Sequence, residues 1–439
     1  MKSFYAVEDK PPLGISIVLA AQHLLAAFGG IVAVPLIMGN CAGLEGSMIV
    51  QLISVTLLCS GFITIIQCTG VGPVGIRLPC VMGTSFVFVA VSISIVREYG
   101  MSGVLGSALV GSLVTILGSF CMKQMRSLLP PLVSGIVILM IGISLVPVGA
   151  DWFAGGKPGS ENYGDISYLI TGLLVAIVVV VINRKGTGLV KAGSIVIGII
   201  LGYLGAWAAG MVDFTQVSEA SWVALPAFMP FKLTFPVTGI IGMSIAYLVA
   251  LMESTGNFLA LSDVGKSPMT SARLSRGLLC DGLGSASFSL FGVLPVASFS
   301  QNVGIVAITG VASRFVVAIT GMLLIVIGLF PKVSALIVTI PSPVLGGAGV
   351  LMFGMITSAG IRILAKHGLD ERSSVIAAVS ITAGVTVTVR PEILSTLPEF
   401  LKITMESGIT TGGLTAVVMN QIFRERQPVE KVQEISQQG

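Results

Sequence analysis

Long apolar stretches alternate with short polar segments along almost the whole chain. A membrane-spanning helix needs about 20 mostly apolar residues to cross a hydrocarbon core about 30 Å thick. By this measure the pattern predicts fourteen helical spans, of which 78–96, 293–312 and 334–356 are the least regular. The predicted spans are 14–38, 47–68, 78–96, 101–121, 129–149, 166–183, 188–211, 236–262, 276–292, 293–312, 315–331, 334–356, 373–389 and 403–422.

The composition agrees with an all-α polytopic membrane protein. Apolar residues make up 54% of the 439 positions and charged residues only 10%, whereas soluble domains are about a quarter charged. The mean hydropathy of +0.99 extends the apolar excess over the whole length. A net charge of +4 is too small to indicate a nucleic-acid partner. Six scattered cysteines without a CxxC pair predict neither disulfides nor a zinc site.

The positive charges give the expected orientation of the chain. Loops on the cytoplasmic side of a membrane are enriched in Lys and Arg. With the N-terminus inside, 18 of the 24 Lys and Arg residues fall inside and 6 fall outside. Merging or dropping one span would spoil this split, so fourteen spans with both termini in the cytoplasm are predicted. The tail 423–439 is expected to be a soluble cytoplasmic end.

Fourteen spans divide into seven plus seven, which predicts an inverted repeat because an odd number of spans reverses the second copy. The third span contains LPCVMGTSFVFVAV (78–91), and its counterpart in the second half contains LPVASFSQNVGIVAI (294–308). Proline disfavours a continuous helix, and Ser, Thr, Val and Phe suit extended backbone. Irregular backbone at membrane depth is tolerated only inside protein or along a watery cavity. Each segment is therefore predicted to be a short extended strand followed by a helix.

These two interrupted spans are candidates for a binding site. If they cross near the middle of the membrane, the starts of their helices would direct partial positive charge and free N–H groups at one place. Such a place suits a small polar or anionic substrate. The alternative is a pair of ordinary helices with proline kinks.

Two carboxylates lie deep in predicted spans, Glu253 and Asp281. A charge at the centre of a membrane helix costs at least about 2.5 kcal/mol and commonly marks a substrate or proton path. Residues 254–257 (STGN) are small and mostly polar, so they surround Glu253 with polar groups and little bulk. This favours a functional role for Glu253 over a structural hydrogen bond. For Asp281 the preference is weaker because the end of the span is closer. His23 fits a structural hydrogen bond as well as a proton relay.

The adjacent carboxamides Gln301 and Asn302 give the most specific indication of a ligand. A carboxamide presents donors and an acceptor in one plane, which matches a heterocycle edge with adjacent carbonyl and N–H groups. Glu253 could accept from a ring N–H, and Phe86 and Phe299 could supply apolar ring faces. These features suit a flat, hydrogen-bonding solute, although sugars or amides would also fit.

The same segments resemble the nucleobase–ascorbate transporter family, the uracil/xanthine permeases, over essentially the whole membrane region. Four of the family's elements occur in the right order. They are Gln22-His23, Gly83-Thr84-Ser85-Phe86, Glu253-Ser254-Thr255-Gly256, and Gln301-Asn302-Val303-Gly304 followed after four residues by Thr309.

The resemblance implies roles for individual residues. Glu253 and Gln301 would be the principal side-chain contacts to the base, with Phe86 stacked on it. Other residues would line the pocket or support it. The implied lining residues are Phe299, Ser300 and the backbone near Ser85, and the implied supporting or proton-coupling residues are Asn302, Asp281, His23, Asn257, Gly304 and Thr309.

The resemblance also implies an architecture of two domains and a homodimer in the bacterial inner membrane. The core domain would contain spans 1–4 and 8–11, and the gate domain spans 5–7 and 12–14. The implied boundaries are 1–121 and 236–333 for the core, 122–235 and 334–422 for the gate, and 423–439 for the cytoplasmic tail.

These inferences lead to one functional hypothesis, proton-coupled import of xanthine or uric acid without a metal or organic cofactor. Family members with Gln at the position of Gln301 resemble xanthine and urate carriers, whereas uracil carriers tend to have Glu. Asn257 departs from the family, because many purine carriers have Asp there, so the proton would travel through Glu253. Alternatives are a carrier of uracil or another nucleobase, an anion carrier of the sulfate/bicarbonate type, and a passive channel. An enzyme is disfavoured because two histidines offer no metal site and no nucleophile motif is present.

Overall fold

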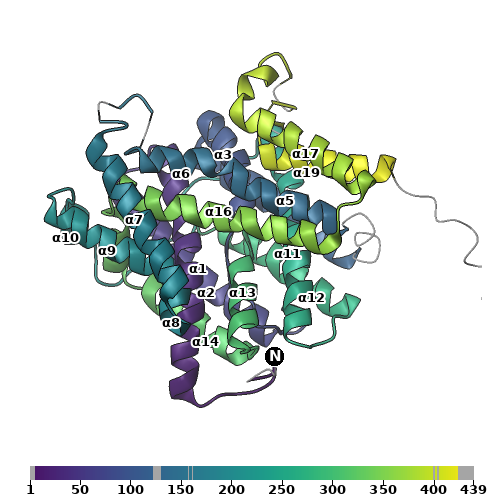
Figure 1. The fold of residues 1–439 in the computed structure, drawn as a ribbon, viewed down its shortest axis with the longest axis horizontal. Helices are drawn as coiled ribbons and strands as arrows, with labels where there is room; N and C mark the ends of the chain where they lie inside the picture. The colour runs from purple at the N-terminus through teal and green to yellow at the C-terminus, as the bar shows by residue number, and fades with distance from the viewer. Residues whose placement is uncertain are drawn as a thin grey trace, which may run out of the picture.

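The computed structural model describes residues 5–121, 130–156, 158–160, 162–398, 401–402 and 405–423, so that of the predicted tail only Phe423 is included. These residues form mostly helices (Figure 1). In chain order the elements are α1 (Leu13–Cys41), α2 (Gly46–Thr69), β1 (Met82–Thr84), η1 (Phe86–Phe88), α3 (Val89–Phe120), α5 (Pro131–Ser144), α6 (Val146–Phe153), α7 (Ile166–Lys185), α8 (Gly188–Ala192), α9 (Ser194–Ala208), α10 (Thr215–Glu219), α11 (Val237–Val264), α12 (Ser271–Ser289), β2 (Val296–Ser298), α13 (Ser300–Thr309), α14 (Arg314–Gly328), α15 (Pro331–Val338), α16 (Ser342–His367), α17 (Glu371–Val389), η2 (Pro391–Leu394) and α19 (Gly408–Ile422).

Several of these helices are long and apolar enough to cross a membrane. In the described part of the chain there are eight, and nine if α14 and α15, which are bent by 81° at their junction, count as one span. Within α3 the helix breaks at Gly100, whose φ of 65° is left-handed and suits glycine. The predicted multi-pass helical fold is confirmed, and fourteen spans stay a prediction.

The predicted span 334–356 is wrong at its start. α14 ends at Gly328, Pro331 begins the short helix α15, and the long apolar helix α16 begins only at Ser342. Pro331 and Pro343 occupy first-turn positions, where proline costs no hydrogen bond and favours the start of a new helix. Hydropathy alone does not show these two restarts.

β1 and β2 pair as a two-stranded antiparallel ribbon, although more than 200 residues separate them in the chain. Met82 lies opposite Ser298, Gly83 opposite Ala297 and Thr84 opposite Val296. The predicted combination of an extended piece followed by a helix is confirmed in both halves, since η1 and α3 follow β1 and α13 follows β2.

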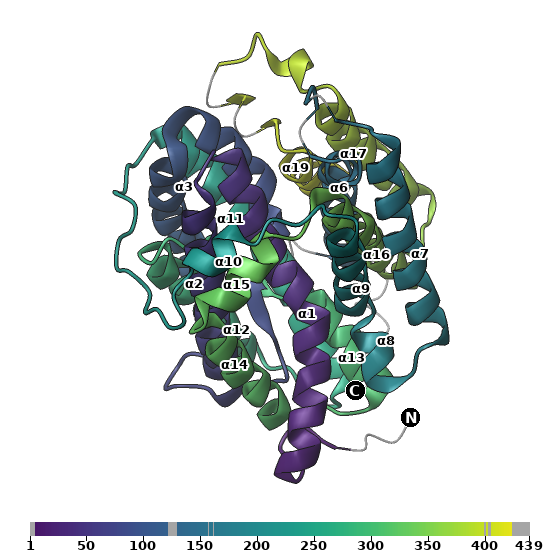
Figure 2. The same cartoon turned by 90° about the vertical axis from the view of Figure 1, so that its left-hand side faces the viewer.

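The helices pack as two groups. In the first, α2 contacts α14, and α3 contacts both α11 and α12; in the second, α16 contacts α5, α6 and α7, and α19 contacts α5 and α17. Figure 2 shows α3, α11, α12 and α14 on one side, α7, α9, α16 and α17 on the other, and α1 passing between them. The strand ribbon contacts α1, α2, α11 and α12, so it belongs to the first group.

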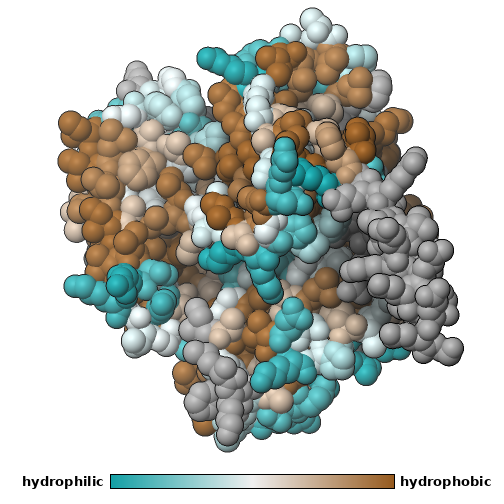
Figure 3. Space-filling view, turned by 45° about the vertical axis from the view of Figure 1, so that its right-hand side comes forward, coloured by the Kyte–Doolittle hydropathy of each residue, from teal (hydrophilic) through white to brown (hydrophobic). Residues whose placement is uncertain are grey.

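Apolar side chains cover much of the surface (Figure 3). On α7 the exposed face includes Leu173 and Leu174, each more than half exposed. In water such a surface would be unfavourable, whereas in a bilayer it contacts lipid tails. The surface therefore agrees with a membrane protein.

Candidate functional site at the strand crossing

The strand ribbon positions the starts of two helices inside the bundle. Every residue of both strands is buried. The Phe299 N–H donates to Val81 O at 3.0 Å, and the Ser85 N–H donates to Pro295 O at 3.1 Å. These bonds extend the pairing beyond β1 and β2. Because the strands are antiparallel, η1 begins at one end of the ribbon and α13 begins at the other.

Glu253 lies at the end of β1. Its Oε2 accepts a hydrogen bond from the Ser85 hydroxyl at 3.3 Å. The same hydroxyl oxygen accepts from the Val87 N–H at 3.2 Å, which caps the first turn of η1. One side chain therefore connects the start of η1 to the carboxylate of α11. Glu253 itself is partly exposed.

Asn257 lies one helical turn beyond Glu253 and reaches β2. Its amide nitrogen donates to Ser298 O at 2.9 Å and lies 3.1 Å from Ser298 Oγ. In an antiparallel ribbon Ser298 O faces away from the partner strand, so this side chain satisfies a carbonyl that pairing leaves free. α11 therefore runs along the ribbon with Glu253 at one strand end and Asn257 at the other.

Gln301 and Asn302 form the first turn of α13 but lie in different surroundings. Gln301 is partly exposed, and Ser300 beside it also is. Asn302 is buried; its Nδ2 donates to Pro79 O at 2.6 Å, and its Oδ1 pairs with Nδ1 of the buried His23. Since the bond to Pro79 fixes the orientation of the amide, His23 Nδ1 must be the donor. Asn302 thus ties α13 to α1 and to the segment before β1.

The two candidate aromatic residues lie in different places. Phe86 packs edge-on against Phe353 of α16, with ring centroids 5.6 Å apart. The Phe299 ring fills the space beside Gly30 and Gly83, where a Cβ on Gly83 would come within 2.6 Å of the ring. Phe86 therefore contacts the second helix group, whereas Phe299 packs α1 against the strands.

Asp281 lies beside the crossing, because its carboxylate interacts with Ser254, the neighbour of Glu253 on α11. It is buried on α12, and Gln67 Nε2 donates to its Oδ1 at 2.9 Å. Gln67 also donates to Gly277 O at 3.1 Å and accepts from the Ile76 N–H at 2.9 Å. The pair links α2, α12 and the segment that leads to β1. Gln67 was missed in the sequence because it lies two residues before the end of α2, where a polar side chain does not stand out from the apolar pattern.

The remaining predicted residues lie along α13. Gly304 is exposed, and a Cβ there would meet no atom within 4 Å. Thr309 Oγ1 donates to Ile305 O at 2.8 Å and accepts from the Val311 N–H at 3.3 Å, which satisfies groups at the helix end. Thr309 therefore stabilises the end of α13 that is far from Gln301.

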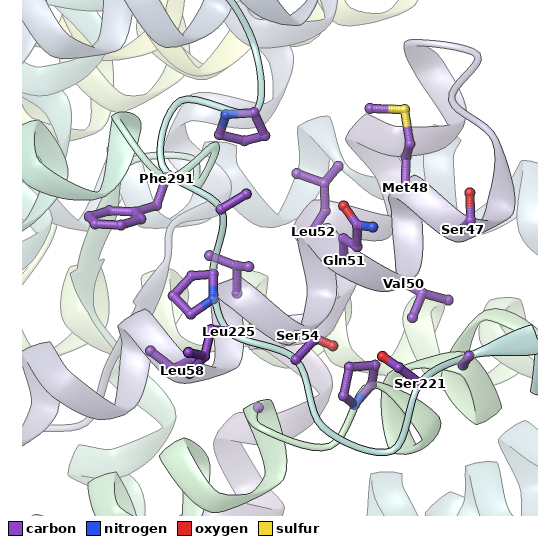
Figure 4. Close-up of a pocket in the computed structure, with 18 of the residues that line it drawn as sticks. Ser47, Met48, Val50, Gln51, Leu52, Ser54, Leu58, Ser221, Leu225 and Phe291 are labelled. Atoms are coloured by element: carbon purple, nitrogen blue, oxygen red, sulfur yellow. The ribbon is translucent and has the colours of Figure 1, made fainter.

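A cavity of about 340 Å³ lies elsewhere in the molecule. Gln51 and Leu52 of α2, Leu225 of the segment after α10, and Phe291 line it (Figure 4). None of the predicted site residues borders this cavity. The candidate site is therefore defined by the strand crossing.

The chain matches the model of a permease family over residues 14–393. The chain belongs to the xanthine/uracil permease family. The permease is 38% identical to the uric acid transporter UacT of Escherichia coli, over 93% of this chain and 86% of that protein. It is also 38% identical to the xanthine permease of Bacillus subtilis, over 96% of each chain.

Among solved structures, the transmembrane domain of the cyanobacterial bicarbonate transporter BicA superimposes on 91% of the permease and 99% of that domain, with a TM-score of 0.59 and 15% identity. At this identity the likeness shows a shared fold and nothing further. The family resemblance, the membrane transport fold and the exclusion of an enzyme are thereby confirmed. The roles of individual residues in the permease stay predictions.

Proposed function

We propose that the permease imports an oxidised purine nucleobase, xanthine or uric acid or both, by proton symport. The observation that carries this proposal is the difference in burial at the strand crossing. Glu253 and Gln301, the predicted contacts to the base, are partly exposed, whereas His23, Asn257 and Asn302 are buried and bound to other groups. Two polar side chains are thus available to a ligand on a scaffold held by the others.

The two available groups suit the edge of an oxidised purine. Gln301 offers a donor and an acceptor in one plane, and the Glu253 carboxylate accepts from a ring N–H. A site of this kind discriminates by hydrogen bonding, since a solute lacking the matching groups leaves buried polar atoms unpaired. Relatives whose names specify xanthine and uric acid support this substrate class.

Glu253 is the group best placed to couple transport to protons. An ionised carboxylate inside the membrane is costly, and protonation or a hydrogen-bond partner removes that cost. Asn257 cannot titrate, and Asp281 is buried, whereas Glu253 is partly exposed and can exchange a proton with the substrate path. In this mechanism Glu253 takes up a proton, pairs with the base and releases both inside. The proton is the coupling ion, and no metal or organic cofactor takes part.

The two helix groups would then act as core and gate. The first group, with the strand ribbon, would carry the base and slide or rock against the second. The Phe86–Phe353 contact joins the two groups beside the ribbon. We further propose a homodimer in the bacterial inner membrane with both termini in the cytoplasm, as the charge distribution and the family indicate.

The same fold in a bicarbonate transporter does not favour an anion as the substrate. A likeness at 15% identity shows only the fold, so it carries no argument for the substrate. The uracil alternative is disfavoured by Gln301, since a glutamate is expected at that position in uracil carriers.

Uptake of labelled xanthine into proteoliposomes with an imposed pH gradient tests the proposal. We expect saturable uptake that rises as the outside becomes more acidic, collapses with an uncoupler, and is inhibited by uric acid but not by uracil. In Glu253→Gln the dependence on pH should disappear, while the exposed control Glu392→Gln should behave as wild type. Normal uptake by Glu253→Gln with an unchanged pH profile would refute the coupling role.

A further inference from the structure

The outer edges of the strand ribbon expose backbone groups that the partner strand cannot bind. In an antiparallel pair alternate residues direct their N–H and C=O groups away from the partner. The bonds Phe299 N–H to Val81 O and Ser85 N–H to Pro295 O show that Met82 and Val296 are such residues. Inside a membrane no bulk water reaches these groups, so side chains must satisfy them.

A single hydroxyl satisfies both the N–H and the C=O of Met82, and another does the same for Val296. Thr64 Oγ1 of α2 accepts from the Met82 N–H at 2.9 Å and lies 3.4 Å from Met82 O, to which it donates. Ser285 Oγ of α12 accepts from the Val296 N–H at 3.0 Å and donates to Val296 O at 3.2 Å. We call these contacts the two hydroxyl clamps. A hydroxyl can fill both roles because it has one donor and two acceptor sites.

The clamps occupy equivalent places in the two halves of the chain. α2 corresponds to the second predicted span and α12 to the ninth, which is the second span of the second half. Met82 is the first residue of β1 and Val296 the first of β2. Thr64 and Ser285 are both at most 1% exposed. The same arrangement therefore arises twice, and the segments that lead to the two hydroxyls match in sequence, LLCSGFIT (57–64) and LLCDGLGS (278–285).

We infer that Thr64 and Ser285 are positioning residues for substrate binding, a role that rests on the proposed transport function. Each clamp fixes the strand whose end leads directly to the candidate contacts: Ser85 follows β1, and Gln301 lies three residues after β2. Without its clamp a strand would lose the bonds that hold its first residue to the neighbouring long helix, and on the outer edge of β2 the bond from Asn257 to Ser298 O would remain. The adjoining helix start would then shift relative to Glu253, and the substrate would meet its partners in the wrong geometry.

The chain offers matched controls on the same helix. Thr56 and Ser60 of α2 are as buried as the clamps, and their hydroxyls have no hydrogen-bond partner among the described residues. Thr64→Val and Thr56→Val are therefore the same change with and without a clamp. Ser285→Ala and Ser60→Ala form a second pair.

The test measures KM for xanthine and membrane abundance for these four variants and for the exchanges Thr64→Ser and Ser285→Thr. Loss of a clamp leaves two buried backbone groups unsatisfied, so we expect KM to rise about tenfold or more with abundance within about twofold of wild type. The controls and the exchanges that keep a hydroxyl should retain the wild-type KM. A wild-type KM in both clamp variants, or an equal rise in the controls, would overturn the inference.

Hydrogen–deuterium exchange tests the clamps without a substrate. Peptides covering 79–86 should exchange faster in Thr64→Val, and peptides covering 294–300 faster in Ser285→Ala, with no change in the controls. Unchanged exchange in both variants would refute the clamps even if uptake fell. If the wild type transports neither purine, the proposed function fails while this measurement still decides the clamps. If Thr64→Val does not reach the membrane, Thr64→Cys replaces it; its weaker hydrogen bond should give an intermediate KM, and a wild-type KM would count against the clamp.

Discussion

Met82 opens β1 and Val296 opens β2, and in each case a hydroxyl from the preceding long helix binds both backbone groups. Past the strands the two halves diverge. A hydroxyl and an aromatic ring follow each strand, Ser85 and Phe86 after β1 and Phe299 and Ser300 after β2, but only the second half continues into carboxamides, beginning with Gln301. The backbone scaffold thus repeats while the side chains differ. One half can supply an apolar face and the other a hydrogen-bonding edge, as an asymmetric planar solute requires.

The clamps also show which residue of the first half of the chain corresponds to which residue of the second half. Matching the Leu-Pro pairs 78–79 and 294–295 would align Phe86 with Asn302, whereas matching the clamped residues aligns Phe86 with Ser300. The two alignments differ by two residues. An even shift keeps the same backbone edge toward the partner strand, so both halves can form the ribbon although their prolines are offset.

The largest effect is expected for Gln301→Ala, which removes the hydrogen-bonding edge of the second half. Loss of two hydrogen bonds in a desolvated site, about 1–3 kcal/mol each, corresponds to a loss of about 30-fold to 10⁴-fold in kcat/KM for xanthine. Uptake kinetics measure it, with immunodetection to show that the protein reaches the membrane. A wild-type KM in this variant would show that Gln301 does not contact the base.

A smaller loss, about 30-fold in uptake rate, is expected for Asn302→Ala. This change removes the hydrogen bonds that hold α13 to α1 and to the segment before β1. The change leaves Pro79 O and His23 Nδ1 without their buried partner, at a cost of about 1–3 kcal/mol per group. Asn183→Ala on α7, which loses one bond to Ser194, is the control and should remain near wild type. Equal losses in the two variants would indicate a general effect on stability instead of a brace at the crossing.

The sequence predicted the crossing more completely than the packing around it. The Leu-Pro segments indicated two strands, and the unusual polar residues Glu253 and Gln301 stood out in apolar spans. By contrast, Thr64 and Ser285 were missed, although each ends one of two matching segments, LLCSGFIT (57–64) and LLCDGLGS (278–285). The match marks the two positions, but only the three-dimensional path of the strands shows that these hydroxyls meet free backbone groups. The restart at Ser342 was missed because hydropathy does not register the direction of a helix.

In Asn257→Asp we expect the uptake rate to fall about tenfold as pH rises, beyond any change seen in wild type. The Asn257 amide donates to Ser298 O. An aspartic acid replaces that donor only when protonated, since an ionised carboxylate is an acceptor and would repel the carbonyl. Uptake by the variant should therefore approach wild type at low pH and fall as pH rises. We would measure the pH profile at constant proton gradient; a profile equal to that of wild type would exclude the Asn257–Ser298 bond from the transport cycle.

The smallest effect is expected for Phe86→Leu, which weakens the apolar face of the first half. An aromatic contact contributes about 0.5–1.5 kcal/mol beyond the area it buries, so KM for xanthine should rise about two- to tenfold. Stacking on a ring face does not depend on the hydrogen-bond donors and acceptors at the edge of the base. The order in which xanthine, uric acid, guanine and uracil compete should therefore stay unchanged. Phe353→Leu removes the ring that Phe86 contacts and controls for lost packing between the helix groups. If Phe86→Leu instead reordered the competitors, as Gln301→Ala is expected to do, the division into one half that stacks and one half that selects would be wrong.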